Sequence, residues 1–102
     1  MAGTNIEKIK EYIAEISKIC EIEQAYIFGS FVKTNDVEHS DIDLALISYK
    51  FNEENFIDYL SRFLIISAGS SLNIEPHLFN TRELDDDFLQ QEVLCKGIKI
   101  ST

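Results

Sequence analysis

Two short segments, one of small residues and one of acidic residues, constrain this chain more than any other feature of its sequence. The apolar run 25–28 ends at Gly29-Ser30, and ten residues later Asp41 and Asp43 open a second, largely apolar run. Apolar runs of this length next to turn-forming residues are typical of buried strands. The sequence therefore predicts two strands, one ending at glycine and serine and the other beginning at two carboxylates.

The spacing of the two carboxylates predicts that they lie side by side. Successive side chains of a strand point to opposite faces, so Asp41 and Asp43 share one face. Close carboxylates repel each other unless a cation lies between them, and Mg²⁺ commonly uses one or two carboxylates plus substrate phosphates. The alternative is a pair of solvated acids. Gly29 favours the metal site, because glycine lets the backbone approach a phosphate, and Ser30 adds a hydroxyl donor.

The rest of the chain predicts an α/β fold. Apolar residues recur at spacings of three and four from Ile6 to Cys20, after a capping box formed by Thr4 and Glu7, which indicates an amphipathic helix. After the carboxylates we expect a helix that starts at Asn52 or Glu53 and closes at 68–71, a strand over 72–79, a helix carrying Leu84 to Val93 that ends at Gly97, and an edge strand over 98–100.

Length and composition indicate one folded domain. A chain of 102 residues is the common size of a single domain, and half of it would be too small for a core of its own. Apolar residues make up 45% of the chain, which is enough to bury such a core. We therefore expect a single domain over residues 1–102, a mixed sheet of about four strands with helices packed on it.

The net charge limits the partners. Nine basic and eighteen acidic side chains give a formal net charge of −9, which opposes binding to a nucleic-acid backbone. A nucleotide that arrives with a divalent metal is still acceptable, and a basic protein would be attracted. Cys20 and Cys95 lie far apart among apolar neighbours, so we expect buried free thiols. Without a signal peptide or an apolar run of membrane-spanning length, the expected location is the cytoplasm.

Together these motifs resemble a known family. Gly29-Ser30, ten intervening residues and Asp41-x-Asp43 match the G-S-x10-D-x-D signature of the polymerase-beta-like nucleotidyltransferases. The resemblance covers nearly the whole chain and is closest to the minimal nucleotidyltransferases of prokaryotes, which lack a second substrate-binding domain. It implies the polymerase-beta-like fold and transfer of a nucleoside monophosphate with release of pyrophosphate. Glu75 matches the family's third carboxylate; its alternative is a solvated strand acid.

The resemblance also implies roles for individual residues. Asp41, Asp43 and Glu75 would be catalytic and hold two Mg²⁺ ions on the triphosphate of ATP, and Glu75 would help to deprotonate the attacking hydroxyl. Many relatives carry a basic residue and a glycine shortly after Gly-Ser. Lys33 would replace the basic residue, the alternative being an ordinary solvated lysine. Thr34 stands in place of the glycine. The nucleotide-binding residues would be Gly29, Ser30, Lys33 and Ser40.

Two histidines lie near these residues in the sequence. His39 precedes the carboxylates by two residues and could assist proton transfer, or it is simply solvated. His77 follows Glu75 by two residues and therefore shares its strand face, where it could contact the nucleotide or the groups around the metal.

The resemblance implies a biological role as well. Minimal nucleotidyltransferases often pair with a small helical HEPN-type toxin, and the transferase then adds AMP to a toxin hydroxyl, typically a tyrosine, as an antitoxin. One alternative is a catalytically weak or inactive binding module that neutralises the toxin by occlusion. Another is transfer to a small molecule such as an aminoglycoside, although the related drug-modifying enzymes carry extra helical domains that 102 residues do not provide.

Overall fold

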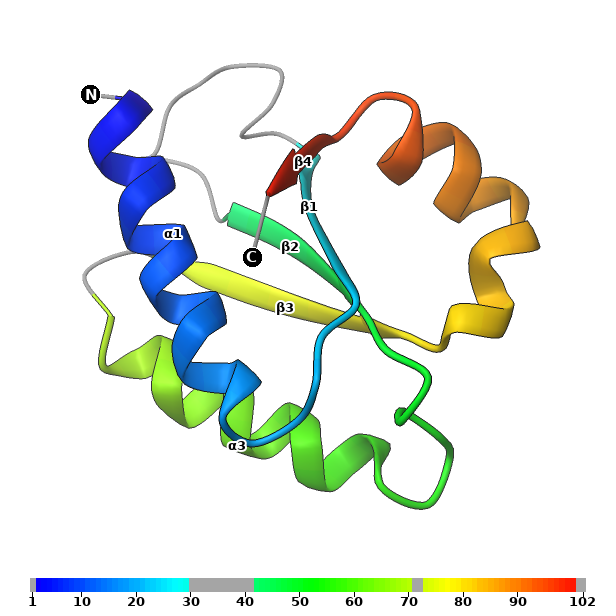
Figure 1. Ribbon diagram of the computed structural model, residues 1–102, viewed down its shortest axis with the longest axis horizontal. Helices are drawn as coiled ribbons and strands as arrows, with labels where there is room; N and C mark the ends of the chain where they lie inside the picture. The colour runs from blue at the N-terminus through cyan, green and yellow to red at the C-terminus, as the bar shows by residue number, and fades with distance from the viewer. Residues whose placement is uncertain (1, 30–41, 71–72, 101–102) are drawn as a thin grey trace.

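A four-stranded mixed sheet in the order β3-β2-β1-β4 forms the centre of the fold (Figure 1). The computed structural model describes residues 2–29, 42–70 and 73–100. β1 pairs in antiparallel fashion with both β2 and β4, whereas β2 and β3 are parallel, so the expected mixed sheet is confirmed. The strands are β1 Gln24–Phe28, β2 Ile42–Ile47, β3 Ile74–Phe79 and β4 Ile98–Ile100.

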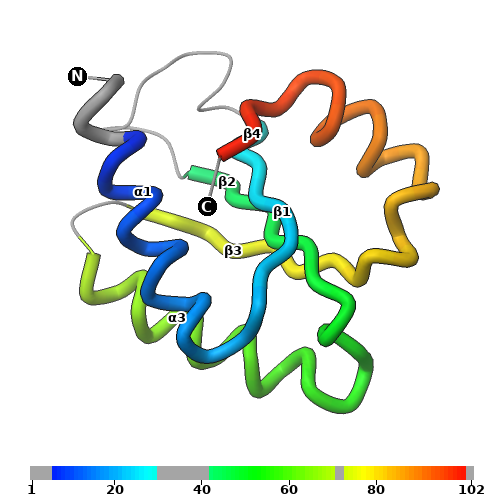
Figure 2. Tube along the Cα trace, viewed as in Figure 1, coloured from blue at the N-terminus to red at the C-terminus, as the bar shows by residue number. Residues whose placement is uncertain are grey.

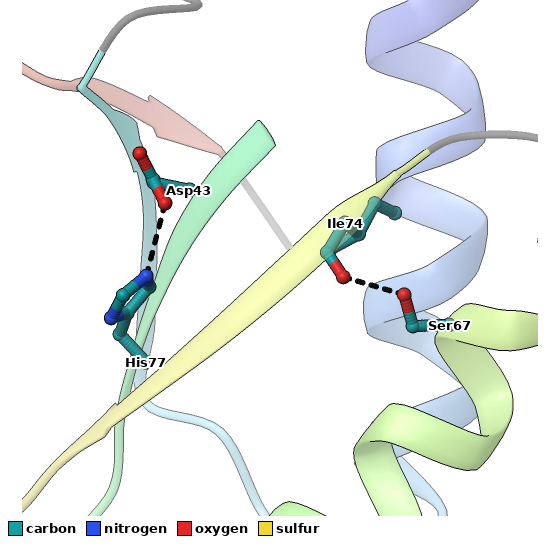
Figure 3. A network of polar contacts seen from close by, with 4 residues as sticks. All are labelled: Asp43, Ser67, Ile74 and His77. Atoms are coloured by element: carbon teal, nitrogen blue, oxygen red, sulfur yellow. Dashed lines mark hydrogen bonds and ion pairs between the residues drawn. The ribbon is translucent and has the colours of Figure 1, made fainter. Parts of the chain in front are cut away.

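Helices α1 (Ala2–Ser17) and α3 (Phe56–Ala68) cover one face of the sheet, where they lie side by side in Figure 1. The main core lies beneath them and takes every second residue of the strands, among them Ile27, Ile42 and Leu44, which are fully buried. One hydrogen bond joins the two helices, and another joins α3 to β3. Tyr12 Oη donates to the carbonyl of Phe63 at 2.9 Å, and Ser67 Oγ donates to the carbonyl of Ile74 at 2.5 Å (Figure 3).

The C-terminal segment packs against the opposite face. It contains a 3₁₀ helix, η1 (Thr81–Asp85), and a π-helical turn, η2 (Leu89–Leu94), and runs from yellow to orange in Figure 2, away from α1 and α3. A smaller core lies on this face. In it Leu89 and Val93 of η2 pack against the strand residues Tyr26, Phe28, Ala45 and Ile47. The sheet is therefore covered on both faces, largely by α1 and α3 on one and only in part by η2 on the other.

Two predicted helix starts are wrong. α1 begins at Ala2, two residues before the expected start at Thr4. α3 begins at Phe56, because the side chain of Asn52 accepts hydrogen bonds from the backbone N–H groups of Glu54 and Asn55, both at 2.9 Å, and holds a turn ahead of the helix. Side chains of this kind compete with helical hydrogen bonds.

The single helix expected to carry Leu84 to Val93 is divided in two. Asp86 has an extended backbone, with φ −65° and ψ 133°, and its carboxylate accepts a hydrogen bond from the N–H of Leu89 at 3.2 Å. It therefore ends η1 and caps the next turn. Asn80 caps η1 through a capping box with Glu83. The short edge strand β4 is present as expected.

Both cysteines are free, but only Cys20 is buried. Cys95 is exposed, so the expected burial is wrong for this residue, which follows η2 on the solvent side. Among the described residues, no helix has both the length and the apolar character needed to cross a membrane.

Candidate functional site

Strand alternation places Asp43, Glu75 and His77 on the sheet face that η2 covers only in part. On β2, the neighbours Ile42 and Leu44 are fully buried under α1 and α3, so Asp43 points the other way. Asp43 is the register partner of Glu75 in the parallel pair β2–β3. The two carboxylates therefore start from adjacent strands at the same level, on the same face.

His77 turns its imidazole towards Asp43. The distance from His77 Nε2 to Asp43 Oδ1 is 3.1 Å, and Figure 3 shows the two groups pointing at each other from neighbouring strands. The register partner of His77 is Ala45, whose small side chain on the same face leaves room for the imidazole. The ring of Phe28 meets the imidazole edge to face, with centroids 5.1 Å apart. Packing and a polar contact together orient His77.

Gly29 lies against the other oxygen of Asp43. Its φ of +80° lies in the left-handed region, which favours glycine, and a Cβ atom built on it would overlap Asp43 Oδ2. The preceding residue, Phe28, is the register partner of Asp43. The end of β1 therefore brings bare backbone alongside the carboxylate, as the sequence predicts for a site where the chain approaches a phosphate.

The three polar side chains can hold a divalent cation. One ligand atom from each of Asp43, Glu75 and His77 lies within 4.8 Å of the others. The side chains of Asp43 and His77 are 24% and 35% exposed, and Glu75 is exposed, so a metal–substrate complex can reach them. Carboxylates and imidazole are both ordinary ligands of divalent metals, so the donor set fits such an ion.

Only part of the predicted site lies in the described part of the chain. The structure brings Gly29, Asp43 and Glu75 together. Sequence reasoning placed His77 on the face of Glu75 but did not predict its contact with Asp43, which depends on the parallel register of β2 and β3. The predicted residues outside the described ranges are Ser30, Lys33, His39, Ser40 and Asp41.

A large cavity lies elsewhere. It has a volume of about 950 Å³, and it is lined by residues such as Phe51, Asn80 and Arg82, which lie beyond the ends of β2 and β3 opposite to Asp43. A smaller cavity of about 290 Å³ is bordered by Glu75 and by Ser67 near the end of α3. We assign the site from the polar groups rather than from cavity size, because the larger cavity contains neither carboxylate.

Comparison with known protein families decides what kind of protein carries this site. The family described as "Polymerase beta, Nucleotidyltransferase" matches residues 7–102, which is most of the chain. The chain belongs to this nucleotidyltransferase family. The match includes both strands that carry the carboxylates of this nucleotidyltransferase domain, and it agrees with the signature at Gly29-Ser30 and Asp41-x-Asp43.

A solved structure shows the same fold as this nucleotidyltransferase domain. It is the crystal structure of a proposed nucleotidyltransferase from Sulfolobus solfataricus, with a TM-score of 0.62 and 21% sequence identity. The alignment covers 92% of this chain and 77% of the other. At this identity the likeness establishes the polymerase-beta-like fold and nothing finer. Among curated proteins, none matches the chain significantly.

Proposed function

We propose that this chain catalyses the Mg²⁺-dependent transfer of AMP from ATP to a hydroxyl group. The observation that carries the proposal is the register pairing of Asp43 with Glu75, beside a Gly29 that leaves no room for a side chain. This arrangement places carboxylates that could bind a metal beside half-buried glycine backbone at the end of a strand. Phosphoryl chemistry needs both, one for the cation and the other for the phosphates.

Each residue then has a distinct role. Asp43 and Glu75, together with Asp41, would hold the divalent ions, which stabilise the charge on the entering and leaving oxygens of an in-line displacement. Glu75 accepts the proton of the attacking hydroxyl, because it is the most exposed of the three described groups. The nucleotide phosphates are bound by the backbone at Gly29 and by Ser30, Lys33 and Ser40.

We further propose that the acceptor is a tyrosine of a HEPN-type toxin, and that the chain acts as its antitoxin in the cytoplasm. The net charge of −9 supports a basic protein partner, because opposite charge speeds association. The resemblance to minimal nucleotidyltransferases supports the same partner.

The test uses the protein encoded next to this chain as the acceptor. The two are incubated with ATP labelled at the α-phosphate and with saturating Mg²⁺, and the label on the acceptor is followed over time. Asp43→Asn and Glu75→Gln each remove one carboxylate charge with little change of shape. Their matched controls are Asp58→Asn on α3 and Glu11→Gln on α1, both exposed and distant from the site.

The outcomes separate the three functions. Label that is lost in Asp43→Asn and Glu75→Gln but kept in both controls supports AMP transfer to the neighbouring protein. If wild type labels no protein at saturating Mg·ATP, transfer to a toxin is wrong. If Asp43→Asn still neutralises the toxin fully in cells, occlusion explains the neutralisation. Label that appears on an added aminoglycoside instead would identify a small-molecule acceptor.

A further inference from the structure

We propose that His77 is a direct metal ligand, so that Asp43, Glu75 and His77 form a mixed oxygen and nitrogen site selective for a divalent transition-metal ion such as Zn²⁺ over Mg²⁺. This inference rests on the proposed function only in placing a cation at Asp43 and Glu75. It concerns which ion binds there without nucleotide and how the imidazole contributes.

The distance between the two closest donors fits a shared ion. Ligands about 2.1 Å from a metal are about 3.0 Å apart at octahedral angles and about 3.4 Å apart at tetrahedral angles. The separation of 3.1 Å between His77 Nε2 and Asp43 Oδ1 lies within this interval. An ion on the lone pair of Nε2 can therefore replace the hydrogen bond once the Asp43 carboxylate turns aside from the line between the two atoms.

Glu75 can complete the set with a change of rotamer alone. Its ligand atom already lies within 4.8 Å of those of Asp43 and His77, and its backbone is held level with Asp43 by the strand register. Because the side chain is exposed, little packing resists its movement towards an ion between the other two groups. Three ligands and one or more waters then satisfy a four- to six-coordinate metal.

The orientation of His77 is fixed by its neighbours rather than by the metal. Phe28 packs edge to face against the imidazole, and Phe28 in turn contacts Phe88 with centroids 6.2 Å apart. This packing keeps Nε2 directed at Asp43, so the nitrogen loses little freedom when a metal binds. With an ion on Nε2, the neutral imidazole carries its proton on Nδ1.

The imidazole changes which ions the site prefers. Mg²⁺ takes oxygen ligands and keeps most of its water, whereas imidazole nitrogen suits Zn²⁺ and other later transition metals. Replacing His77 should therefore weaken Zn²⁺ binding far more than Mg²⁺ binding. Loss of Glu75 should weaken both, because both ions bind carboxylate oxygen.

The first experiment measures this difference by calorimetry. Dissociation constants for Zn²⁺ and Mg²⁺ are determined on the whole chain for wild type, His77→Gln, Glu75→Gln and Glu11→Gln. We expect His77→Gln to weaken Zn²⁺ binding by at least the roughly 10- to 100-fold known for groups that only orient metal ligands. We expect its Mg²⁺ affinity to stay within about threefold of wild type, and Glu11→Gln, the control on α1, to leave both affinities unchanged. A Zn²⁺ to Mg²⁺ affinity ratio that is the same in His77→Gln and wild type would overturn the proposal.

The second experiment observes the imidazole nitrogens of the wild-type chain directly. The chain has two histidines, so ¹⁵N-labelled imidazoles give few signals, and His39→Gln assigns them. On addition of Zn²⁺, Nε2 of His77 should lose its proton and shift, with the proton found on Nδ1. If Nε2 keeps its proton when Zn²⁺ is bound, His77 only hydrogen-bonds Asp43 and is not a ligand. Neither result depends on AMP transfer, which is measured separately with Mg²⁺ and ATP.

Discussion

Gly29 and Asp43 approach each other so closely that a methyl group on Gly29 would overlap the Oδ2 atom of Asp43. The backbone at Gly29 also has φ +80°, which costs a residue with a Cβ atom about 1–2 kcal/mol. Gly29→Ala should therefore lower the free energy of unfolding by at least that amount. It should also reduce AMP transfer, because Asp43 must turn away from its position. Urea unfolding followed by circular dichroism and the labelling assay measure the two effects.

Gly69→Ala is the matched control for this substitution. Gly69 has φ −84°, and its added Cβ would lie 3.6 Å from the carbonyl oxygen of Ile66, an ordinary contact. Alanine there should be neutral or stabilising by up to about 1 kcal/mol, because it restricts the unfolded chain. Equal effects of the two substitutions would show that Gly29 is not constrained by Asp43.

The side chain of Asn80, at the end of β3, connects η1 to the loop at Phe51. Its removal should lower the free energy of unfolding by about 1–2 kcal/mol. Its side chain accepts a hydrogen bond from the N–H of Arg82 at 2.8 Å and donates one to the carbonyl of Phe51 at 2.6 Å. Asn80→Ala removes both. Thermal unfolding should show a clear decrease in Tm, and Gln91→Ala, at an exposed position of η2, should leave it nearly unchanged. A Tm unaffected by Asn80→Ala would contradict this account.

Tyr12 should make stability depend on alkaline pH. Burial raises the pKa of its hydroxyl well above the usual value near 10, and the hydroxyl donates to the carbonyl of Phe63. Above about pH 10 the unfolded chain releases this proton while the folded chain keeps it, so the stability that Tyr12 contributes is present below pH 10 and is lost as pH rises further.

Tyr12→Phe tests this dependence. It should cost about 1 kcal/mol at pH 7 through the lost hydrogen bond. The difference in free energy of unfolding between wild type and Tyr12→Phe should become smaller between pH 10 and 11, because phenylalanine does not titrate. Denaturant unfolding at each pH measures it, and Tyr49→Phe, at a residue 56% exposed, provides the baseline. A difference that stays constant over this pH interval would show that Tyr12 ionises equally in both states.

Gly97 is the second glycine that cannot accept a side chain. An added Cβ would overlap the carbonyl oxygen of Val93 and lie 2.8 Å from that of Ile27, and both are backbone atoms that cannot rotate away. Gly97→Ala should therefore separate β4 from β1 and lower stability by more than Gly69→Ala. Hydrogen exchange at the register partners Ile27 and Ile98 would report this separation, and unchanged protection there would contradict it.

The strands were predictable because their apolar runs are short and bounded by turn-forming residues, and the face of Asp43 followed from the alternation of β2. The contact between Asp43 and His77 was not predictable, because local sequence does not specify that β2 and β3 are parallel with Asp43 opposite Glu75. The break at Asp86 was also missed. An acidic residue is compatible with a continuous helix, where its charge favours the first turn, but here the carboxylate caps the following turn.

The pairing of Ala25 with Ile100 has a consequence for how the molecule reaches its native state. β1 lies inside the sheet, between β2 and β4, yet one of these partners is synthesised long before the other. Contacts between residues so distant in the sequence close slowly, because a long loop must lose entropy before the strands pair. On the ribosome, β1 therefore keeps an open edge until β4 emerges. The strand that carries Phe28 to His77 is thus among the last to gain both of its partners.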